Sequence, residues 1–266
     1  MENMDINIEE VVEKITVEVR KCGDIILNAR RSDNMVDAKE GHANFVTTYD
    51  KRVQDELERR LVRIIPGAAF AGEEGDNFII PKEGYTFVVD PIDGTTNFIY
   101  DYHMSCISVG LVKDGKQCAG VVYNPYLNEM YTAIKGKGAY LNGRRLSVSS
   151  TPFERSLALF GTAPYNEELR EKSFKIAYAL FEKSADVRRS GSAAIDLCAV
   201  AAGRANIFVE LILSPWDFAA GALMVTEAGG VVSDANGKEL ILDKKNSMVA
   251  RGKNMEEIAE QIFKIQ

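Results

Sequence analysis

The sequence predicts an α/β (α+β) protein in which two helices precede an antiparallel sheet, followed by alternating strands and helices. Three observations carry this prediction. Apolar residues recur at spacings of three and four over residues 8–29 and 53–65, which is typical of helices facing a core. Short apolar runs between residues 70 and 134 are typical of strands, and Asp114-Gly115 between two of them favours an antiparallel hairpin. From about residue 150 strand and helix patterns alternate.

Each element follows from its local pattern, in chain order. Pro66-Gly67 closes the second helix, because proline and glycine interrupt helical geometry. The predicted strands of the first half are 70–71, 85–89, 107–112, 119–123 and 130–134. The second half is predicted as strand 157–160, helices 167–183 and 192–202, strand 207–209, helix 218–228, strand 231–232 and a terminal helix 255–263. Because no Pro/Gly/Ser-rich linker separates the halves, we expect one folding unit over residues 1–266, with 1–150 and 151–266 as alternative subdomains.

Composition and charge narrow the class of protein. With 266 residues, of which 46% are hydrophobic and 27% charged, the chain is long enough to bury a large core. A net charge of −7 and a pI near 5.1 disfavour a nucleic-acid partner, since such proteins usually present a basic face to phosphate backbones. An acidic protein that binds phosphate needs local positive charge, which bound cations would supply.

No feature of the sequence points to a membrane or to the cell exterior. Residues 1–10 are acidic and lack the basic start and continuous apolar stretch of an export signal. No apolar run approaches the roughly 20 residues that a bilayer span requires. The cysteines lie far apart and form no Cys-x-x-Cys pair: Cys22, Cys106, Cys118 and Cys198. We therefore expect a soluble, cytoplasmic protein with reduced thiols and no membrane partner.

The segment 88–97 carries the strongest chemical signal, because an apolar strand runs directly into two carboxylates, a turn and two hydroxyls. Asp90 and Asp93 are three residues apart, so a turn brings both carboxylates into one small volume. Their like charges repel unless hard divalent cations lie between them. Gly94, Thr95 and Thr96 look like the start of a helix, whose free N–H groups attract phosphate. Taken alone, Asp93-Gly94-Thr95 is equally typical of a capped turn.

Two further acidic positions favour the metal interpretation. Gly72-Glu73-Glu74 closes another predicted strand, and Trp216-Asp217 precedes a helix rich in alanine and glycine. Adjacent acids at a strand end are more often solvated surface, and a lone Trp-Asp has the same ordinary interpretation. The combination of carboxylates is what predicts a site for divalent cations: Glu73, Asp90, Asp93 and Asp217.

These motifs resemble those of the inositol monophosphatase family, and the resemblance covers nearly the full chain. Its two signatures match residues 90–98 (DPIDGTTNF) and residues 216–221 (WDFAAG), the latter followed by 226–230 (TEAGG). Further family segments match residues 44–50, 72–74 and 189–194. The resemblance implies a layered α-β-α-β-α sandwich, a single catalytic unit, a homodimer, lithium sensitivity and two or three Mg²⁺ ions per active site.

The same resemblance implies roles for individual residues. The first metal would be held by Glu73, Asp90, the backbone carbonyl of Ile92 and Thr95, and the second by Asp90, Asp93 and Asp217. Glu73 and Thr95 would orient and deprotonate the nucleophilic water, with Asp50 as the hydrogen-bond partner of Thr95. The phosphate or the rest of the substrate would meet Gly94, Thr95, Thr96, Gly191, Ala193, Glu210 and Lys39. Asn44 and Asn206 stand where some members carry aspartate, which removes charge.

The implied reaction is Mg²⁺-dependent hydrolysis of a phosphate monoester on a small polyol or sugar, with myo-inositol monophosphate as the leading substrate. Related phosphatases remain alternatives: those for fructose 1,6-bisphosphate, 3′-phosphoadenosine 5′-phosphate and histidinol phosphate. The nucleotide type should carry extra basic or aromatic residues, and the sequence shows no obvious set. A rival of another class is a non-catalytic protein that binds metal or ligand. Loss of Glu73, Thr95 or Asp217 is its usual signature, and all three are present.

Overall fold

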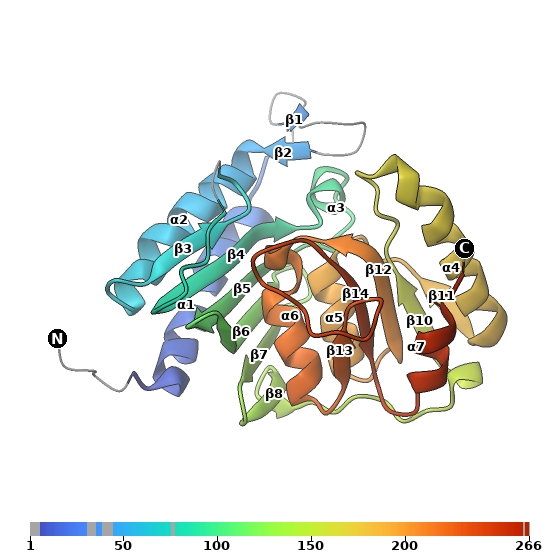
Figure 1. Ribbon diagram of the computed structural model, residues 1–266. Coiled ribbons are helices and arrows are strands. Elements are labelled where there is room, and N and C mark those ends of the chain that lie inside the picture. Colours follow the sequence, from blue (N-terminus) through green and yellow to red (C-terminus); the bar gives the residue numbers. More distant parts are fainter. Residues whose placement is uncertain (1–5, 31–35, 39–44, 76–77, 263, 266) are drawn as a thin grey trace.

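The protein is built of alternating layers of helix and sheet. The computed structural model describes residues 6–30, 36–38, 45–75, 78–262 and 264–265. Helices α1 (Ile8–Leu27) and α2 (Thr48–Ile64) cover one face of a seven-stranded sheet (Figure 1). Helices α5 (Ala193–Ala201) and α6 (Pro215–Glu227) lie between this sheet and a five-stranded one, whose outer face is covered by α4 (Glu167–Lys183) and α7 (Glu256–Ile262). The predicted α-β-α-β-α sandwich is confirmed.

The seven-stranded sheet carries one half of the site. Its strands lie in chain order: β3 (Ala69–Gly72), β4 (Tyr85–Asp93), β5 (Cys106–Lys113), β6 (Lys116–Asn124), β7 (Glu129–Ile134), β8 (Gly138–Leu141) and β9 (Arg144–Arg145). β3 runs parallel to β4, and the later neighbours pair antiparallel. The predicted hairpin joins β5 to β6, with φ of 51° at Asp114 and 75° at Gly115. The short strands β8 and β9 were not predicted.

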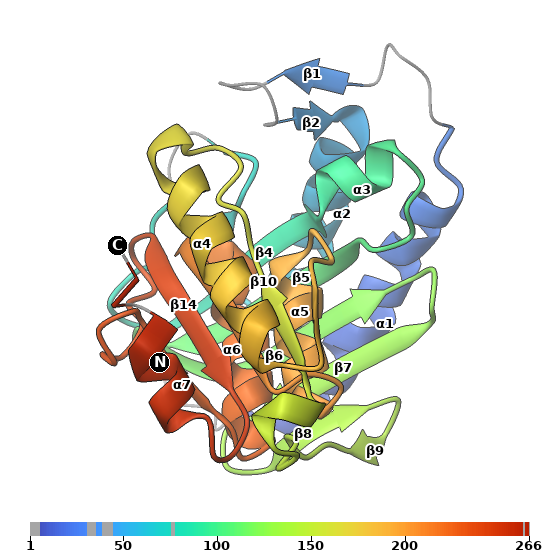
Figure 2. The same ribbon diagram turned by 90° about the vertical axis from the view of Figure 1, so that its right-hand side faces the viewer.

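The five-stranded sheet has the order β11-β10-β12-β14-β13. Its strands are β10 (Leu157–Phe160), β11 (Asp186–Arg188), β12 (Ile207–Leu213), β13 (Val231–Ser233) and β14 (Asn246–Arg251). β10 runs parallel to β11 and β12, whereas β14 is antiparallel to both of its neighbours. At one end of the sheet lie the carboxyl ends of β10, β11 and β12 and the amino end of β14. Helix α4 begins at this end (Figure 2). A small sheet of β1 (Val36–Ala38) and β2 (Phe45–Thr47) precedes α2.

Two helices begin earlier than predicted, because each starts at a side chain that caps it. α2 was predicted from residue 53 and begins at Thr48, where Thr47 N donates to Asp50 Oδ2 at 2.8 Å. α6 was predicted from residue 218 and begins at Pro215, where Ser214 N donates to Asp217 Oδ2 at 2.7 Å. Each cap fixes a carboxylate in the first turn of its helix.

The buried core holds the capped starts of α2 and α6 in place. The inner helices α5 and α6 share one buried cluster with the facing sides of both sheets, including Leu197, Phe208, Phe218 and Met248. A second cluster joins α1 and α2 to the other face of the seven-stranded sheet, with Phe87 and Phe98 fully buried. The buried packing leaves little freedom to the ends of β4 and α6. Among the helices that the structure describes, none has the length and apolar character to cross a lipid bilayer.

Candidate metal centre and active site

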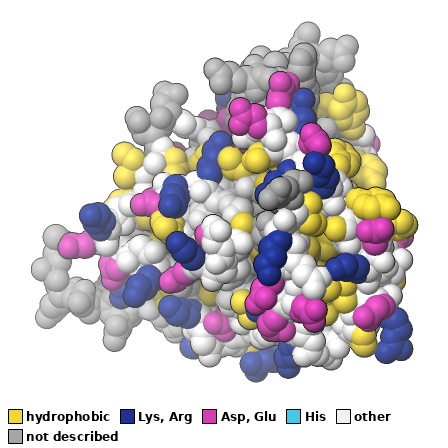
Figure 3. Space-filling model, turned by 45° about the vertical axis from the view of Figure 1, so that its right-hand side comes forward, with side chains coloured by type: hydrophobic (Ala, Val, Ile, Leu, Met, Phe, Trp, Pro, Cys, Tyr) yellow, Lys and Arg dark blue, Asp and Glu magenta, His cyan; other side chains and the backbone are white. Residues whose placement is uncertain are grey.

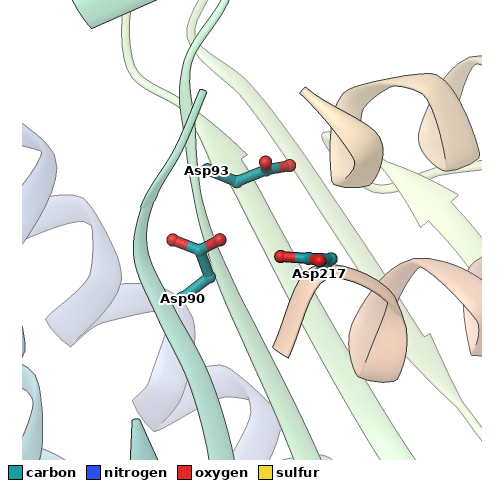
Figure 4. A group of neighbouring side chains, drawn as sticks. All are labelled: Asp90, Asp93 and Asp217. Atoms are coloured by element: carbon teal, nitrogen blue, oxygen red, sulfur yellow. The ribbon is translucent and has the colours of Figure 1, made fainter. Parts of the chain in front are cut away.

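Three aspartates from two elements meet between the layers. Asp90 and Asp93 stand at the end of β4, and Asp217 stands in the first turn of α6. Each offers a carboxylate oxygen, and these oxygens lie within 4.8 Å of one another. Figure 4 shows the three carboxylates directed into one shared space. The fold thus brings together three of the four carboxylates that the sequence singled out.

An irregularity in β4 explains how one strand supplies two of them. The pairing with β5 runs regularly to Asp90 opposite Ser108 and resumes at Asp93 opposite Cys106, with one extra residue on β4. In a regular strand, positions three apart point to opposite faces, and a bulge of one residue removes that difference. Asp90 Oδ1 accepts a hydrogen bond from Ile92 N at 3.0 Å, which holds the irregular segment in place.

The aspartates oppose one another's ionisation. Burial raises the pKa of Asp90 and Asp217 well above the usual range, and the neighbouring charges of Glu73 and Asp93 raise both further. Burial also raises the pKa of Asp93 to about 6, against hydrogen bonds that favour its charged form. Within the described residues, no lysine, arginine or histidine forms a salt bridge with these three carboxylates. An oxygen donor set with uncompensated negative charge fits a hard divalent cation.

Asp93 is shared between this group and helix α5. Its Oδ2 accepts hydrogen bonds from Ser192 Oγ at 2.7 Å and from Ala194 N at 2.6 Å. Ser192 is the N-cap of α5 and is buried. The family resemblance led to Gly191 and Ala193 on this turn and not to Ser192. Ser192 was predicted as the first residue of the helix 192–202, and the preference of serine for the N-cap was the available signal.

A buried network at the start of α2 holds the Thr95 hydroxyl. Thr95 Oγ1 lies 3.1 Å from Asp50 Oδ1 and 3.2 Å from the carbonyl oxygen of Ile92. Asp50 Oδ2 accepts hydrogen bonds from the N–H and the hydroxyl of Thr47. Burial raises the pKa of Asp50 to about 6, and the hydrogen bonds from Thr47 oppose that shift. Asp50 therefore lies where it can accept the Thr95 proton in a hydrogen bond.

Glu73 lines the same cavity as the aspartates but is not one of the group of three. The turn that carries it is clamped by Gln54 of α2. The Gln54 amide oxygen accepts from Glu74 N at 2.8 Å, and its amide nitrogen donates to the Glu74 carbonyl oxygen. Gln54 stands one helical turn after Asp50. The first turns of α2 thus position both Glu73 and Thr95.

Gly94 begins the short helix α3 (Thr95–Ile99). Its φ of 91° is left-handed, and a Cβ at this position would lie 2.9 Å from the Met104 carbonyl oxygen, so glycine is required. Asn97 Nδ2 donates to that oxygen at 2.7 Å and to the Ser190 carbonyl oxygen at 2.9 Å. The bond to Ser190 ties α3 to the turn before α5, so the amino ends of both helices lie beside Asp93.

Glu210 reaches the cavity from β12 of the five-stranded sheet. Its carboxylate lies against the backbone of Gly161, where a Cβ would come within 1.9 Å of Glu210 Cδ. Its Oε1 accepts a hydrogen bond from Ala163 N at 3.3 Å. Burial raises the pKa of Glu210 to about 7, while the Ala163 amide and the charge of Arg189 lower it.

One cavity of about 900 Å³ is lined by nearly every residue predicted to bind metal or substrate. Glu73, Asp90, Ile92, Asp93, Gly94, Thr95, Thr96, Gly191, Ala193, Glu210 and Asp217 line it. Asp50 lies behind Thr95. Lys39 and Asn44 fall outside the described residues. Asn206 is buried, and its amide donates to the Thr151 carbonyl oxygen.

Comparison with known proteins adds a family context. Residues 7–266 match the model of the inositol monophosphatase family. Inositol monophosphatase 2 of Solanum lycopersicum is 39% identical over 246 residues, which are 88% of this chain and 91% of the relative. Nus factor SuhB of Escherichia coli (strain K12) is 38% identical over 220 residues, which are 82% of each chain. Among solved structures, the IMPase of Thermotoga maritima matches with a TM-score of 0.86 at 30% identity, covering 96% of this chain and 97% of that one. The extragenic suppressor protein suhB of Bartonella henselae matches with a TM-score of 0.86 at 33% identity, covering 96% and 98%.

Proposed function

The chain belongs to the inositol monophosphatase family, whose members are metal-dependent and act on phosphorylated substrates, and we propose that it catalyses Mg²⁺-dependent hydrolysis of a small polyol phosphate monoester. The leading substrate is myo-inositol monophosphate, which would yield inositol and phosphate. The observation that carries the proposal is the convergence of Asp90, Asp93 and Asp217 in the cavity that Thr95 also lines. Because these aspartates come from both halves of the chain, residues 1–266 would act as one catalytic unit.

The donor atoms suit Mg²⁺. Asp90, Asp93 and Asp217 would hold two or three ions together with Glu73 and the carbonyl oxygen of Ile92. Mg²⁺ prefers oxygen ligands and keeps several of its waters, so few protein ligands are needed for each ion. When bound, Mg²⁺ supplies neutralisation of the phosphate charge and a lower pKa for water at the site.

The protein's own groups would orient the attacking water. When the Thr95 hydroxyl donates its single proton to Asp50, its lone pairs are left to accept a hydrogen bond from the water. Asp50 cannot turn away, because its second oxygen is held by Thr47. Glu73 would accept the proton that the water loses as it attacks the phosphorus. The ester P–O bond opposite the attack breaks, and the leaving alcohol oxygen would take up a proton from water.

Other cavity residues would hold the ester. The backbone at Gly94, Thr95 and Thr96 would meet the phosphate at the start of α3, where N–H groups are free. Glu210 would accept a hydrogen bond from a substrate hydroxyl, and Gly191 and Ala193 would line the same wall. For Lys39, a place near the phosphate stays a prediction from the sequence.

The direct test is phosphate release by the purified protein, with and without Mg²⁺. The panel comprises inositol 1-phosphate, fructose 1,6-bisphosphate, 3′-phosphoadenosine 5′-phosphate, histidinol phosphate and NADP. Mg²⁺-dependent release from at least one ester, blocked by millimolar lithium, is the expected result. If no ester in the panel releases phosphate although metal binding is demonstrated, the proposal is contradicted and a non-catalytic role is favoured.

The expected homodimer and cytoplasmic location also stay predictions. Light scattering on the purified protein measures the mass directly, and one chain is 29.4 kDa. A mass near twice that value supports the dimer, and a mass near one chain contradicts it.

A further inference from the structure

The cavity is lined by more cationic and aromatic side chains than the proposed chemistry uses. Its acidic residues are Glu73, Asp90, Asp93, Asp196, Glu210 and Asp217. Its cationic residues are Arg170, Arg189 and Lys245, and the rings of Phe160, Tyr165 and Phe174 also line it. These basic and aromatic residues come from separate segments and share no motif, so no set was visible in the sequence.

The topology places two of the cationic side chains at one end of the cavity. Arg189 directly follows β11, the edge strand, and Arg170 lies at the end of the first turn of α4, which packs on β10 and β11. Lys245 precedes β14, three strands away from β11, which corresponds to about 14 Å at a strand spacing of about 4.8 Å. We call the end formed by Arg170, Arg189, Phe160 and Phe174 the α4 side.

Basic and apolar side chains occur together on this part of the molecule. Figure 3 brings forward the side on which α4 lies in Figure 1 and shows basic, acidic and hydrophobic side chains interspersed there. Phe160 and Phe174 meet edge to face, with ring centroids 6.5 Å apart. The two rings are apolar and line the same cavity as the two guanidinium groups, a combination that suits a ring-shaped substrate that carries charge.

Both guanidinium groups are available to a ligand. Arg189 is exposed and, within the described residues, forms no salt bridge. Its charge lowers the pKa of Asp196 and of Glu210 through a charge–charge interaction alone. Arg170 pairs with Glu167 at 3.1 Å and donates to the Pro164 carbonyl oxygen at 3.2 Å. The Glu167 side chain is 76% exposed, so water screens that pair and a phosphate can compete for the arginine.

Charge decides where a second anionic group would lie. Near Asp90, Asp93 and Asp217 it would be repelled, and the metals proposed there are taken up by the reacting phosphate. At the α4 side it would meet two guanidinium groups, which bind phosphate through paired N–H donors. The cavity volume of about 900 Å³ lies near the upper end of the roughly 300–1,000 Å³ typical of ligand pockets, so there is room for both groups.

We propose that the α4 side is a subsite for a second phosphate group of the substrate, with Arg189 as its main ligand and Arg170 beside it. This inference rests on the proposed phosphatase function and, among its candidate substrates, favours those with two phosphate groups over myo-inositol monophosphate. Sugar or nucleoside esters that carry a second phosphate are hydrolysed with higher kcat/KM than the matching monoesters.

The test compares matched esters in matched variants. The kcat/KM ratio is measured for fructose 1,6-bisphosphate against fructose 1-phosphate, and for 3′-phosphoadenosine 5′-phosphate against adenosine 3′-phosphate. We expect at least one ratio of about tenfold or more, the size of one hydrogen bond to a charged group. Arg189→Gln should bring that ratio toward one. Arg188→Gln is the control, because Arg188 pairs with Asp186 and does not line the cavity.

Three results would overturn the subsite: ratios near one in the unaltered protein, an equal fall in Arg188→Gln, or a fall in Lys245→Gln and not in Arg189→Gln. If no ester is hydrolysed, the phosphatase proposal fails by itself. Calorimetry with the same ester pairs in Ca²⁺ then decides the subsite without turnover. About tenfold tighter binding of the bisphosphate that Arg189→Gln removes supports it, and equal affinities overturn it.

Discussion

Ser192 Oγ donates a 2.7 Å hydrogen bond to Asp93 Oδ2, which joins the N-cap of α5 to a carboxylate of the candidate metal group. The same Ser192 oxygen accepts from Ile195 N at 3.3 Å, so its single proton is left for Asp93. Asp93 Oδ2 is therefore committed to α5, and Oδ1 is the oxygen left to face a cation. The start of one helix in this way sets the orientation of a residue on a distant strand.

Ser192→Ala should raise the Mg²⁺ concentration for half-maximal activity by about tenfold, since a hydrogen bond to a charged group contributes about 1.5–3 kcal/mol. Ser192→Thr keeps the hydroxyl and should restore most of the metal affinity. Asn7→Ala is the control for losing a helix cap, because Asn7 caps α1 by accepting from Glu9 N at 3.1 Å and is remote from the cavity. A Mg²⁺ titration of activity that is the same in Ser192→Ala and in the unaltered protein would contradict this coupling.

Asp90→Asn should abolish turnover and, without metal, stabilise the fold. Asp90 is buried among like charges, which raise its pKa, so its charged form costs free energy until a cation is bound. Thermal unfolding in EDTA at pH 8 should show a higher Tm by a few degrees, since about 1 kcal/mol corresponds to roughly 2–4 °C in a protein of this size. Near-normal activity, or a Tm that falls, would show that the assignment of Asp90 is wrong.

Gln54→Leu should lower kcat/KM by about tenfold, or about 1.4 kcal/mol in the barrier, because it releases the turn that carries Glu73. Asp55→Asn, the exposed neighbour on the same helix, should have no effect. Steady-state kinetics at saturating Mg²⁺, with circular dichroism to confirm folding, measure the difference. Equal rates in the two variants would mean that the clamp by α2 is dispensable.

Glu210→Gln should change the pH dependence of stability. The pKa of Glu210 is about 7 in the folded protein and starts from 4.5 in an unperturbed glutamate. Between these values the folded state holds a proton that the unfolded state has lost, so stability falls as pH rises through about 7. In EDTA the variant should therefore be more stable than the unaltered protein at pH 8 and equal to it at pH 4. A difference that is the same at both pH values would contradict a titrating Glu210.

The same substitution tests recognition of the substrate. If Glu210 accepts a hydrogen bond from a substrate hydroxyl, Glu210→Gln should raise KM for inositol 1-phosphate more than for a phosphate ester without hydroxyls. Equal effects on the two esters would remove Glu210 from substrate recognition.

Part of the site was predictable because its residues follow each other in short motifs. The run from Asp90 to Thr96 indicates a strand, a turn and a helix start, and the structure has β4, the Gly94 turn and α3 at those positions. The layered fold was expected from the family resemblance, whereas apolar patterns gave the single elements, of which α4 and β10 have the predicted bounds. The early starts of α2 and α6 were also within reach, since Thr47 and Ser214 each stand three residues before an aspartate.

Contacts between distant segments were not predictable. Ser192 and Asp93 are 99 residues apart, and Gln54 and Glu74 are 20 apart. Neither pair leaves a periodic pattern, because each depends on how the layers stack and not on a repeat within one element. The α4 side has the same origin, since Arg170 on α4 and Arg189 after β11 line one cavity only when β10 and β11 pair in parallel.

Asp217 caps helix α6 and also belongs to the group of three carboxylates, and a substitution can separate these two roles. Its Oδ2 accepts the Ser214 N–H that begins α6, while the carboxylate as a whole belongs to the group of three. Asparagine at this position would still accept that bond through its amide oxygen and would lose the charge. A descendant under selection for folding alone would therefore keep an oxygen-bearing side chain here long after activity had gone. Under the proposed function, asparagine at 217 in a related sequence would keep the helix cap and lose the metal ligand, so aspartate at 217 is weaker evidence of catalysis than Glu73.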